Sequence, residues 1–373
     1  MAKKVSLRKK LVVIVAGIIT LLVGIFGARL IYHKLREPAY YTPNGQPVYA
    51  SPIGLIPINE VIIPKEAGTR AVLPGAKWVP QSFNNCGPAT TAMVLQYFGF
   101  NVSQEETKAH LRTSADDKNV FTYEISDYLR KDYGIESKIF YGGNLQLIKK
   151  LIANGFYIVV EDFLHPNDDI GHDLILRGFD DEQGVLIADD SYFGVNITYP
   201  YSQFVNGQWK PFNYEYMPVY KAGSEPLLSA IIGPAMDTTI MYKDAATKAR
   251  SEIATNTNDM YAWFNLGSNL YGLKDYVGAK AAFEKSRSIG WPMRMLWYQI
   301  ESIYTYNALH EYQNAIDFSN LALIGNDSFA EPHLEKAIAY KGLGNISAAR
   351  DEANKALLYY PNFKKAQDFI SSL

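Results

Sequence analysis

Cysteine and histidine are scarce in this chain, which has one cysteine and six histidines in 373 residues. A single cysteine excludes an intramolecular disulfide, so Cys86 is either a small buried apolar group or a chemically active one. Charge of one sign is also lacking: the formal net charge is -2, which argues against nucleic acid as a partner. We expect no cofactor and no metal ion. With 48% hydrophobic and 20% charged residues, the chain has the composition of two or three folded domains.

An uncharged apolar run at residues 11–28 follows a basic segment, residues 1–10. The run is long enough to cross a bilayer as a helix. Five basic residues precede it and three follow at 29–36, which predicts a cytoplasmic N-terminus and a remainder outside the cytoplasm. A cleaved signal peptide is the alternative. No small-x-small site follows Ala28, so we favour an uncleaved anchor at residues 11–32 and a single-pass membrane protein.

Composition divides the rest of the chain into four parts. Residues 33–74 contain seven prolines, which predicts an extended stalk. Residues 75–221 show helical patterns first and short β-branched runs afterwards, which predicts an α+β domain. Residues 222–237 contain glycine and proline and are expected to be a linker. Residues 238–373 show only helical patterns, so an all-α domain is expected to follow the linker.

The all-α part repeats small and aromatic residues with a period near 34 residues. Trp263, Gly267 and Ala279 have the spacing of a tetratricopeptide repeat, and two further copies follow. The pattern resembles tetratricopeptide repeats and implies a superhelix that binds a protein partner in its concave groove. Tyrosines recur along the first helices of the repeats, where they can face that groove: Tyr271, Tyr304 and Tyr340.

Cys86 lies where a polar loop is followed by an apolar run of helical periodicity. Asn84 or Asn85 can cap this helix, and Pro88 is tolerated in its first turn. Gly99 is typical of the residue that ends a helix. In the first turn, the thiol meets the positive end of the helix dipole and unpaired backbone N–H groups, which stabilise a thiolate. We therefore expect a lowered thiol pKa and reactivity well below about pH 8.

A nucleophilic thiol needs a histidine to move its proton and a carboxylate or amide to orient that histidine. Three of the six histidines lie in the stalk or the repeats, His110 lies on a predicted surface helix, and His165 lies in a polar loop. His172 directly follows Gly171 and opens an apolar strand. That position suits a rigidly held base, so we take His172 as the candidate.

The next predicted strand, residues 184–188, leads into two carboxylates, Asp189 and Asp190. Antiparallel pairing with the strand of His172 would bring one of them beside the imidazole. Paired aspartates at a strand end are also common in turns. The residues alone leave the choice between the two carboxylates open.

These segments together resemble the papain-like peptidases of family C39 over residues 75–221. The resemblance implies that Cys86 is the nucleophile, and that His172 is the general base oriented by Asp190. It also implies that Gln81 donates to the oxyanion together with the Cys86 backbone N–H. The residues that carry the resemblance are Val79-Pro80-Gln81, Asn85-Cys86-Gly87-Pro88, Gly171-His172, Gly178-Phe179-Asp180, Asp190 to Gly194, Tyr201-Ser202-x-Phe204 and Trp209.

Two positions depart from the family pattern. Ser191 stands where the family usually has proline, which keeps Asp189 as an alternative to Asp190. Asp173 stands where the family tends to be apolar, and puts a charge beside the base. Asp190 is preferred because the tyrosine and glycine downstream then align.

The sequence therefore predicts a membrane-anchored, extracytoplasmic cysteine peptidase that acts on a peptide or protein substrate, with repeats that recruit the substrate or a partner. Family members that mature bacteriocins are fused to a transporter, and these 373 residues contain no such segment. Cleavage at double-glycine sites is thus one option. Two alternatives remain: a thiol amidase or transpeptidase acting on cell-wall peptides, and a non-catalytic peptide-binding scaffold.

Overall fold

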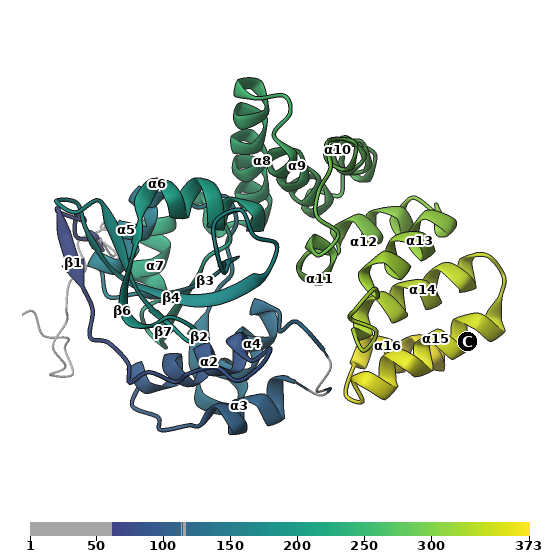
Figure 1. The fold of residues 1–373 in the computed structure, drawn as a ribbon, viewed down its shortest axis with the longest axis horizontal. Coiled ribbons are helices and arrows are strands. Elements are labelled where there is room, and N and C mark those ends of the chain that lie inside the picture. The colour runs from purple at the N-terminus through teal and green to yellow at the C-terminus, as the bar shows by residue number, and fades with distance from the viewer. Residues whose placement is uncertain (1–61, 113, 115–116) are drawn as a thin grey trace, which may run out of the picture. The chain divides into compact units, whose positions relative to one another are not determined.

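A computed structural model describes residues 62–112, 114 and 117–373 of the chain (Figure 1). Residues 62–373 form one compact unit. In the described part, no helix combines the length and the apolar character needed to cross a bilayer. The predicted anchor at 11–32 lies outside the described residues, so it stays a prediction.

The first half of the described chain is built on one antiparallel sheet, with the strand order β2-β7-β3-β4-β5-β6 and with β1 paired to the far end of β4. The central strand β4 pairs with both β3 and β5, so both of its neighbours are antiparallel. The strands are β1 (Arg70–Val72), β2 (Ile135–Ser137), β3 (Tyr157–Phe163), β4 (Gly171–Asp180), β5 (Val185–Asp190), β6 (Gly194–Pro200) and β7 (Met217–Lys221).

Helices pack on both faces of this sheet, so β3 and β4 are buried on both sides. On one face, α2 (Cys86–Tyr97), α3 (Gln104–Leu111) and α4 (Thr122–Tyr133) share a core with Val159 and Ile175. On the other face, α5 (Leu145–Ala153), α7 (Glu225–Ile232) and the segment from α6 (Tyr201–Gln203) to Trp209 share a core with Leu174 and Leu176. The two faces of β4 therefore belong to two different cores.

The segment expected to be a linker, 222–237, is largely helical. It contains α7 and a 3-10 turn, Gly233–Met236. Leu228 and Ile232 of α7 lie in the same core as the residues of α5, which explains why this segment does not extend into solvent. The boundaries predicted for the separate domains stay predictions.

The second half is entirely helical and consists of antiparallel pairs: α9 packs on α10, α12 on α13, and α14 on α15. Small residues allow the close approach, since a Cβ atom added to Gly267 would lie 2.7 Å from the Phe283 ring. The helices are α8 (Thr238–Thr255), α9 (Met260–Gly272), α10 (Tyr276–Ile289), α11 (Met295–Tyr298), α12 (Glu301–Ala308), α13 (Tyr312–Ala322), α14 (Ala330–Gly342), α15 (Ile346–Tyr359) and α16 (Lys364–Ser371).

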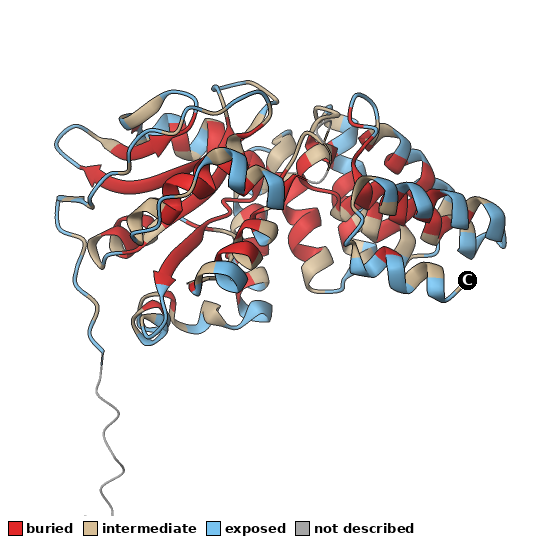
Figure 2. Ribbon diagram, turned by 90° about the horizontal axis from the view of Figure 1, so that it is seen from below, coloured by how far each residue is buried: buried red, intermediate tan, exposed pale blue. Residues whose placement is uncertain are grey.

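The helical half contacts the sheet domain directly, through α9 and through the segment before α12. Asn213 and Asn269 exchange two amide hydrogen bonds of 2.8 and 2.9 Å, and Gln299 donates to the carbonyl of Pro211. Phe163 of β3 lies in the same core as the residues of α9 and α10. Buried residues continue through the strands and the inner sides of the helices (Figure 2). The inner face of the repeats is therefore covered, at least in part, by this chain's own sheet domain.

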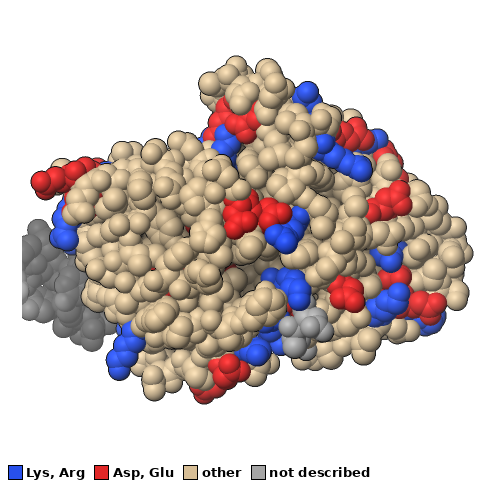
Figure 3. All heavy atoms as spheres, viewed as in Figure 1, with Lys and Arg blue, Asp and Glu red and all other residues tan. Residues whose placement is uncertain are grey.

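Charged side chains of both signs are interspersed on the face shown in Figure 3, in line with a net charge near zero. Few charges lie on the part of this face formed by the sheet domain.

Candidate active site

Cys86 is the first residue of α2, and two contacts fix that end of the helix against β4. The Thr90 hydroxyl donates to the Asp173 carbonyl over 2.9 Å. A Cβ atom on Gly87 would lie 2.9 Å from Val120 Cβ and 3.3 Å from a carboxylate oxygen of Asp173, so glycine alone permits this approach. Asn85 occupies the cap position, but its side chain accepts from Arg112 instead of capping the helix.

The surroundings of the thiol favour the neutral form. Burial raises the pKa of Cys86 far above its ordinary value, and the negative charge of Asp173 raises it further. Hydrogen bonds from the backbone N–H groups of Asp173 and Gly87 act in the opposite direction but are outweighed. The expectation of a lowered thiol pKa was wrong, because burial of the thiol and the neighbouring Asp173 carboxylate outweigh the first-turn N–H groups.

His172 forms a buried pair with Asp190. Its Nε2 atom lies 2.9 Å from Asp190 Oδ2, and the imidazole and carboxylate are 3% and 0% exposed. The Tyr199 hydroxyl donates to the same oxygen, and two backbone N–H groups that follow Asp190 donate to Oδ1. Burial opposes ionisation of Asp190, but the hydrogen bond and charge of His172 hold its pKa below the ordinary value. The pair is therefore an oriented imidazole on an ionised carboxylate.

Asp189 lies on the opposite face of β5 and is engaged elsewhere. Its Oδ1 atom accepts from Arg177 Nε over 2.8 Å, and its Oδ2 atom accepts from the Tyr97 hydroxyl over 2.8 Å. Backbone N–H groups of Ala76 and Asn196 complete its hydrogen bonds. The structure thus brings Asp190, and not Asp189, to His172.

Cys86 packs against β4, the strand that carries His172, but its thiol is not hydrogen-bonded to the imidazole. Neighbouring residues of a strand point to opposite faces. His172 accordingly faces the side of Leu174, and Asp173 faces α2 and the thiol. In the described part of the chain, no hydrogen bond joins Cys86 to His172, and the imidazole Nδ1 atom has none recorded. The thiol lies beside the backbone of the residue that follows the histidine.

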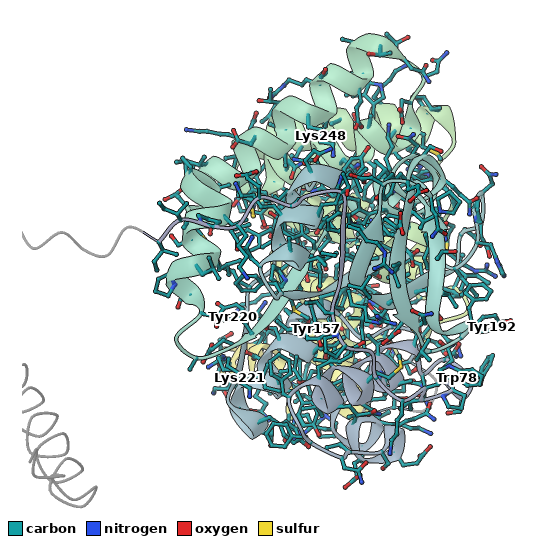
Figure 4. All side chains as sticks on the ribbon, turned by 90° about the vertical axis from the view of Figure 1, so that its left-hand side faces the viewer. Trp78, Tyr157, Tyr192, Tyr220, Lys221 and Lys248 are labelled. Atoms are coloured by element: carbon teal, nitrogen blue, oxygen red, sulfur yellow. The ribbon has the colours of Figure 1, made fainter. Side chains whose placement is uncertain are left out.

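Gln81 is oriented by Ser191, which sequence reasoning noted only as a departure from the family. The Gln81 N–H donates to the Ser191 carbonyl over 2.9 Å, and the Ser191 hydroxyl donates to Gln81 Oε1 over 2.8 Å. This bond fixes the oxygen end of the Gln81 amide, so the NH2 group, which is the donor, points the other way. A proline at position 191 has no hydroxyl for this bond. Trp78 and Tyr192 lie at the same edge of the domain, next to these two segments (Figure 4).

Two further neighbours of the thiol gave no signal in the sequence. Glu161 pairs with Asp173 in the β3–β4 register, and its charge acts on the thiol. Tyr298 comes from α11 of the repeats, and its ring would lie 2.7 Å from a Cβ atom on Gly171. A local sequence pattern cannot predict a contact between residues so far apart in the chain. Within the described residues, no three His, Cys, Asp or Glu side chains are placed to hold a metal ion.

Comparison with family models decides what kind of domain carries this arrangement. Residues 73–217 match the model of the Peptidase_C39 like family. These residues belong to that family. The match falls on the part of the chain that carries the predicted resemblance, and helical pairs follow residue 238, as the sequence predicted. No curated protein matches the chain.

Several solved structures are similar to parts of this chain. A C39-like peptidase from Bacillus anthracis is 15% identical, covers 41% of this chain and 98% of its own, and has a TM-score of 0.35. A double glycine motif protease from an AMS/PCAT transporter, solved with its leader peptide, is 21% identical, covers 41% and 99%, and has a TM-score of 0.32. MamA is 18% identical, covers 38% and 81%, and has a TM-score of 0.33.

Proposed function

We propose that this protein is a cysteine peptidase that hydrolyses peptide bonds with Cys86 as nucleophile and the His172–Asp190 pair as base. One observation carries the proposal: a buried, carboxylate-oriented imidazole opens the strand against which the first turn of α2 packs, and that turn holds the chain's single cysteine. Membership of residues 73–217 in a peptidase family supports the same assignment.

The reaction begins from a neutral thiol. As the sulfur attacks the substrate carbonyl carbon, the thiol proton passes to the Nδ1 atom of His172, because Nε2 is held by Asp190. The C–N bond of the tetrahedral intermediate then breaks, and the imidazolium protonates the leaving amine. Water next attacks the thioester, and His172 takes a proton from it and returns one to the sulfur. The free carboxylic acid and the thiol are regenerated.

The oxyanion of each tetrahedral intermediate needs hydrogen-bond donors that are already in place. The NH2 group of Gln81 and the backbone N–H of Cys86, in the first turn of α2, serve this purpose. Ser191 holds the amide of Gln81 in the required orientation through its hydroxyl. His172 must also come within hydrogen-bond distance of the thiol when the substrate is bound, since catalytic hydrogen bonds often tighten only in that complex.

A non-catalytic peptide-binding domain is the second candidate, and the Asp173 carboxylate favours it. This carboxylate lies against the thiol and raises its pKa, the opposite of what activation of a nucleophile requires. An amidase or transpeptidase would use the same residues as the peptidase and would differ in the acyl group or in the acceptor of the thioester.

Digestion of a mixed peptide pool by the full-length protein, read by mass spectrometry, separates these functions. A peptidase releases new carboxyl termini in the wild type and none in Cys86→Ala, and a transpeptidase produces joined peptides instead. Asp173→Asn should raise the cleavage rate at neutral pH by lowering the thiol pKa. If neither the wild type nor Asp173→Asn gives a Cys86-dependent product, the non-catalytic peptide-binding function is favoured.

We also propose that residues 11–32 hold the enzyme in a membrane, with both domains outside the cytoplasm, and that the repeats bind a protein partner. The apolar run after a basic segment supports the anchor. Membrane fractions should retain full-length protein through carbonate washing. A soluble product that begins near residue 29 would indicate a cleaved signal peptide instead.

A further inference from the structure

A cavity of ≈ 260 Å³ lies between the peptidase domain and the repeats. Residues next to α4, on β3 and before β7 line one side of it, and residues of α8, α9 and α12 line the other. Because phenol rings present negative faces, a lining rich in tyrosine attracts positive charge. The tyrosines that line the cavity are Tyr123, Tyr141, Tyr242, Tyr271, Tyr298 and Tyr304.

Carboxylates add to this negative lining. Glu161, Glu215 and Glu301 face the cavity, whereas Lys365, an exposed residue, is the one basic side chain in the described lining. Glu215 is the best satisfied of the three, since the Thr122 hydroxyl donates to it over 2.5 Å and Tyr141 also forms a hydrogen bond with it. The cavity therefore has three acidic groups and one basic group. Burying a charged group without a partner costs free energy.

Several of these groups lack hydrogen-bond donors. Glu161 is 7% exposed, and no hydrogen bond to its carboxylate is recorded in the described part of the chain. Glu301 Oε2 and Ser268 Oγ are buried atoms without a hydrogen-bond partner. Buried acceptors are nearly always satisfied in folded proteins, so such a group of exceptions indicates a missing donor. A ligand that brings several N–H groups and a positive charge would supply it.

An organic cation fits this lining better than a metal ion does. Among the described residues, no three His, Cys, Asp or Glu side chains are placed to hold a metal ion, and the cavity is lined by tyrosines as well as carboxylates. Tyr271 and Tyr304 stack at 5.7 Å between ring centroids, and Tyr141 and Tyr242 also stack at 5.7 Å. Paired rings of this kind, combined with carboxylates, suit an ammonium or a guanidinium group on an aliphatic stem.

The cavity also borders the candidate active site. Glu161 lies opposite Asp173 in the β3–β4 register, and the Asp173 carboxylate contacts the Cys86 thiol. Tyr298 lies against Gly171, the residue before His172. A side chain that enters the cavity therefore belongs to a substrate residue at or next to the bond under attack.

We propose that this cavity is a specificity pocket that binds the lysine or arginine side chain of a substrate residue at or beside the cleaved bond. The proposal rests on the peptidase function proposed above. The repeats supply half of the pocket, so they determine which bond is cut and do not act only through a remote partner. Tyr271 and Tyr304 of the repeats then contact the substrate itself.

The first test digests a proteome-derived peptide pool with the full-length wild type, Glu301→Gln and Glu311→Gln. Glu311 pairs with Lys280 and lies outside the cavity, so its variant removes the same charge elsewhere. We expect lysine and arginine at or beside the cleaved bond at least about tenfold more often than chance in the wild type and in Glu311→Gln. The preference should fall severalfold in Glu301→Gln. Cleavage without such a preference, or a preference unchanged in Glu301→Gln, overturns the pocket but leaves the peptidase function standing.

The second test does not depend on activity. Calorimetry measures binding of Nα-acetyl-lysine amide and Nα-acetyl-norleucine amide to the full-length Cys86→Ala protein. We expect the lysine compound to bind at least about tenfold more tightly. Glu161→Gln and Glu301→Gln should reduce that ratio, and Glu311→Gln should not. Equal affinities for the two compounds overturn the proposal even if no peptide is ever cleaved, and a lysine preference without cleavage leaves the pocket and removes the peptidase.

Discussion

Two groups of buried carboxylates in this chain differ in the number of hydrogen bonds that they accept. Asp189 and Asp190, at the end of β5, each accept four hydrogen bonds. In the cavity, Glu161 has none recorded in the described part of the chain, and one oxygen of Glu301 has no partner. Burial outweighs the one backbone hydrogen bond to Glu301 and raises its pKa to about 7, and burial together with neighbouring carboxylates raises the pKa of Glu161. Asp189 and Asp190, with all their hydrogen bonds made, hold other side chains in position. The cavity carboxylates, which lack donors, can accept hydrogen bonds from a ligand.

Breaking the fully bonded group should have the largest effect. Asp190→Asn should lower peptide cleavage by roughly 10³- to 10⁴-fold, because an amide cannot stabilise the imidazolium or fix the tautomer of His172. Stability should change little, since the amide keeps the shape and some of the hydrogen bonds. Cleavage rates on a single peptide, with a melting curve for each protein, check this. Wild-type turnover in Asp190→Asn would remove His172–Asp190 from the mechanism.

The neighbouring carboxylate should affect stability more than chemistry. Asp189→Asn leaves the buried guanidinium of Arg177 without its negative partner, which should cost about 3–5 kcal/mol in the free energy of unfolding. Urea unfolding measures this cost. Turnover per folded molecule should fall much less than in Asp190→Asn. The reverse ranking of the two variants would mean that the assignment of the orienting carboxylate is shifted by one residue.

A smaller effect is expected from the hydroxyl that orients Gln81. Ser191→Ala should lower kcat by about tenfold and leave KM nearly unchanged, because Gln81 acts on the transition state and not on the bound substrate. Ser202→Ala, an exposed serine in α6, is the matched control. Steady-state kinetics on the three proteins decide the point. A change confined to KM would place Ser191 in substrate binding instead.

The cavity carboxylates should make stability depend on pH in an unusual direction. Burial raises the pKa of Glu215 and Glu301 to about 7, against 4.5 for an unperturbed glutamate. Between these values the folded chain holds protons that the unfolded chain has released, so stability should fall as the pH rises from about 4.5 to about 7. Urea unfolding across this range should show a fall on the order of 1–3 kcal/mol.

Replacing both glutamates by glutamine should reduce that slope, and Glu311→Gln should leave it unchanged. Some slope should persist, because burial also raises the pKa of Asp173, Glu331 and Glu335 to about 7. A flat profile in the wild type would mean that the cavity carboxylates are stabilised by donors other than those described.

Much of the fold follows from local patterns in the sequence. Ser103 and Glu106, with the three-residue spacing of a capping box, form one, and α3 begins after it. Short β-branched runs, expected in the second part of residues 75–221, form β3, β4 and β5. The edge strands β1 and β2, of three residues each, were not predicted, because so short a run has no detectable period and forms only by pairing with β4 or β7.

Features of the site that depend on local sequence were predictable, and contacts that depend on strand pairing or on packing were not. The place of Cys86 at a helix start follows from the loop before it and the apolar period after it. The preference for Asp190 over Asp189 came from alignment, and the structure explains it by the alternation of β5, which points one carboxylate to each face. Asp173, Glu161 and Tyr298 meet at the thiol only through strand register and through the packing of the repeats. No local sequence pattern records those contacts.

The central claim is that the Cys86 thiol transfers its proton to His172. The most direct measurement is the rate of Cys86 alkylation at neutral pH by a chloromethyl ketone built on a cleaved peptide, because His172 approaches the thiol only when a peptide is bound; the proteins compared are the full-length wild type, His172→Ala and His165→Ala. His165 lies in an exposed loop and contacts the rings of Tyr192 and Phe193, so it controls for loss of a nearby imidazole. We predict a rate at least about tenfold lower in His172→Ala than in the other two proteins, because the thiol loses its proton acceptor. Equal rates in all three proteins would contradict the claim.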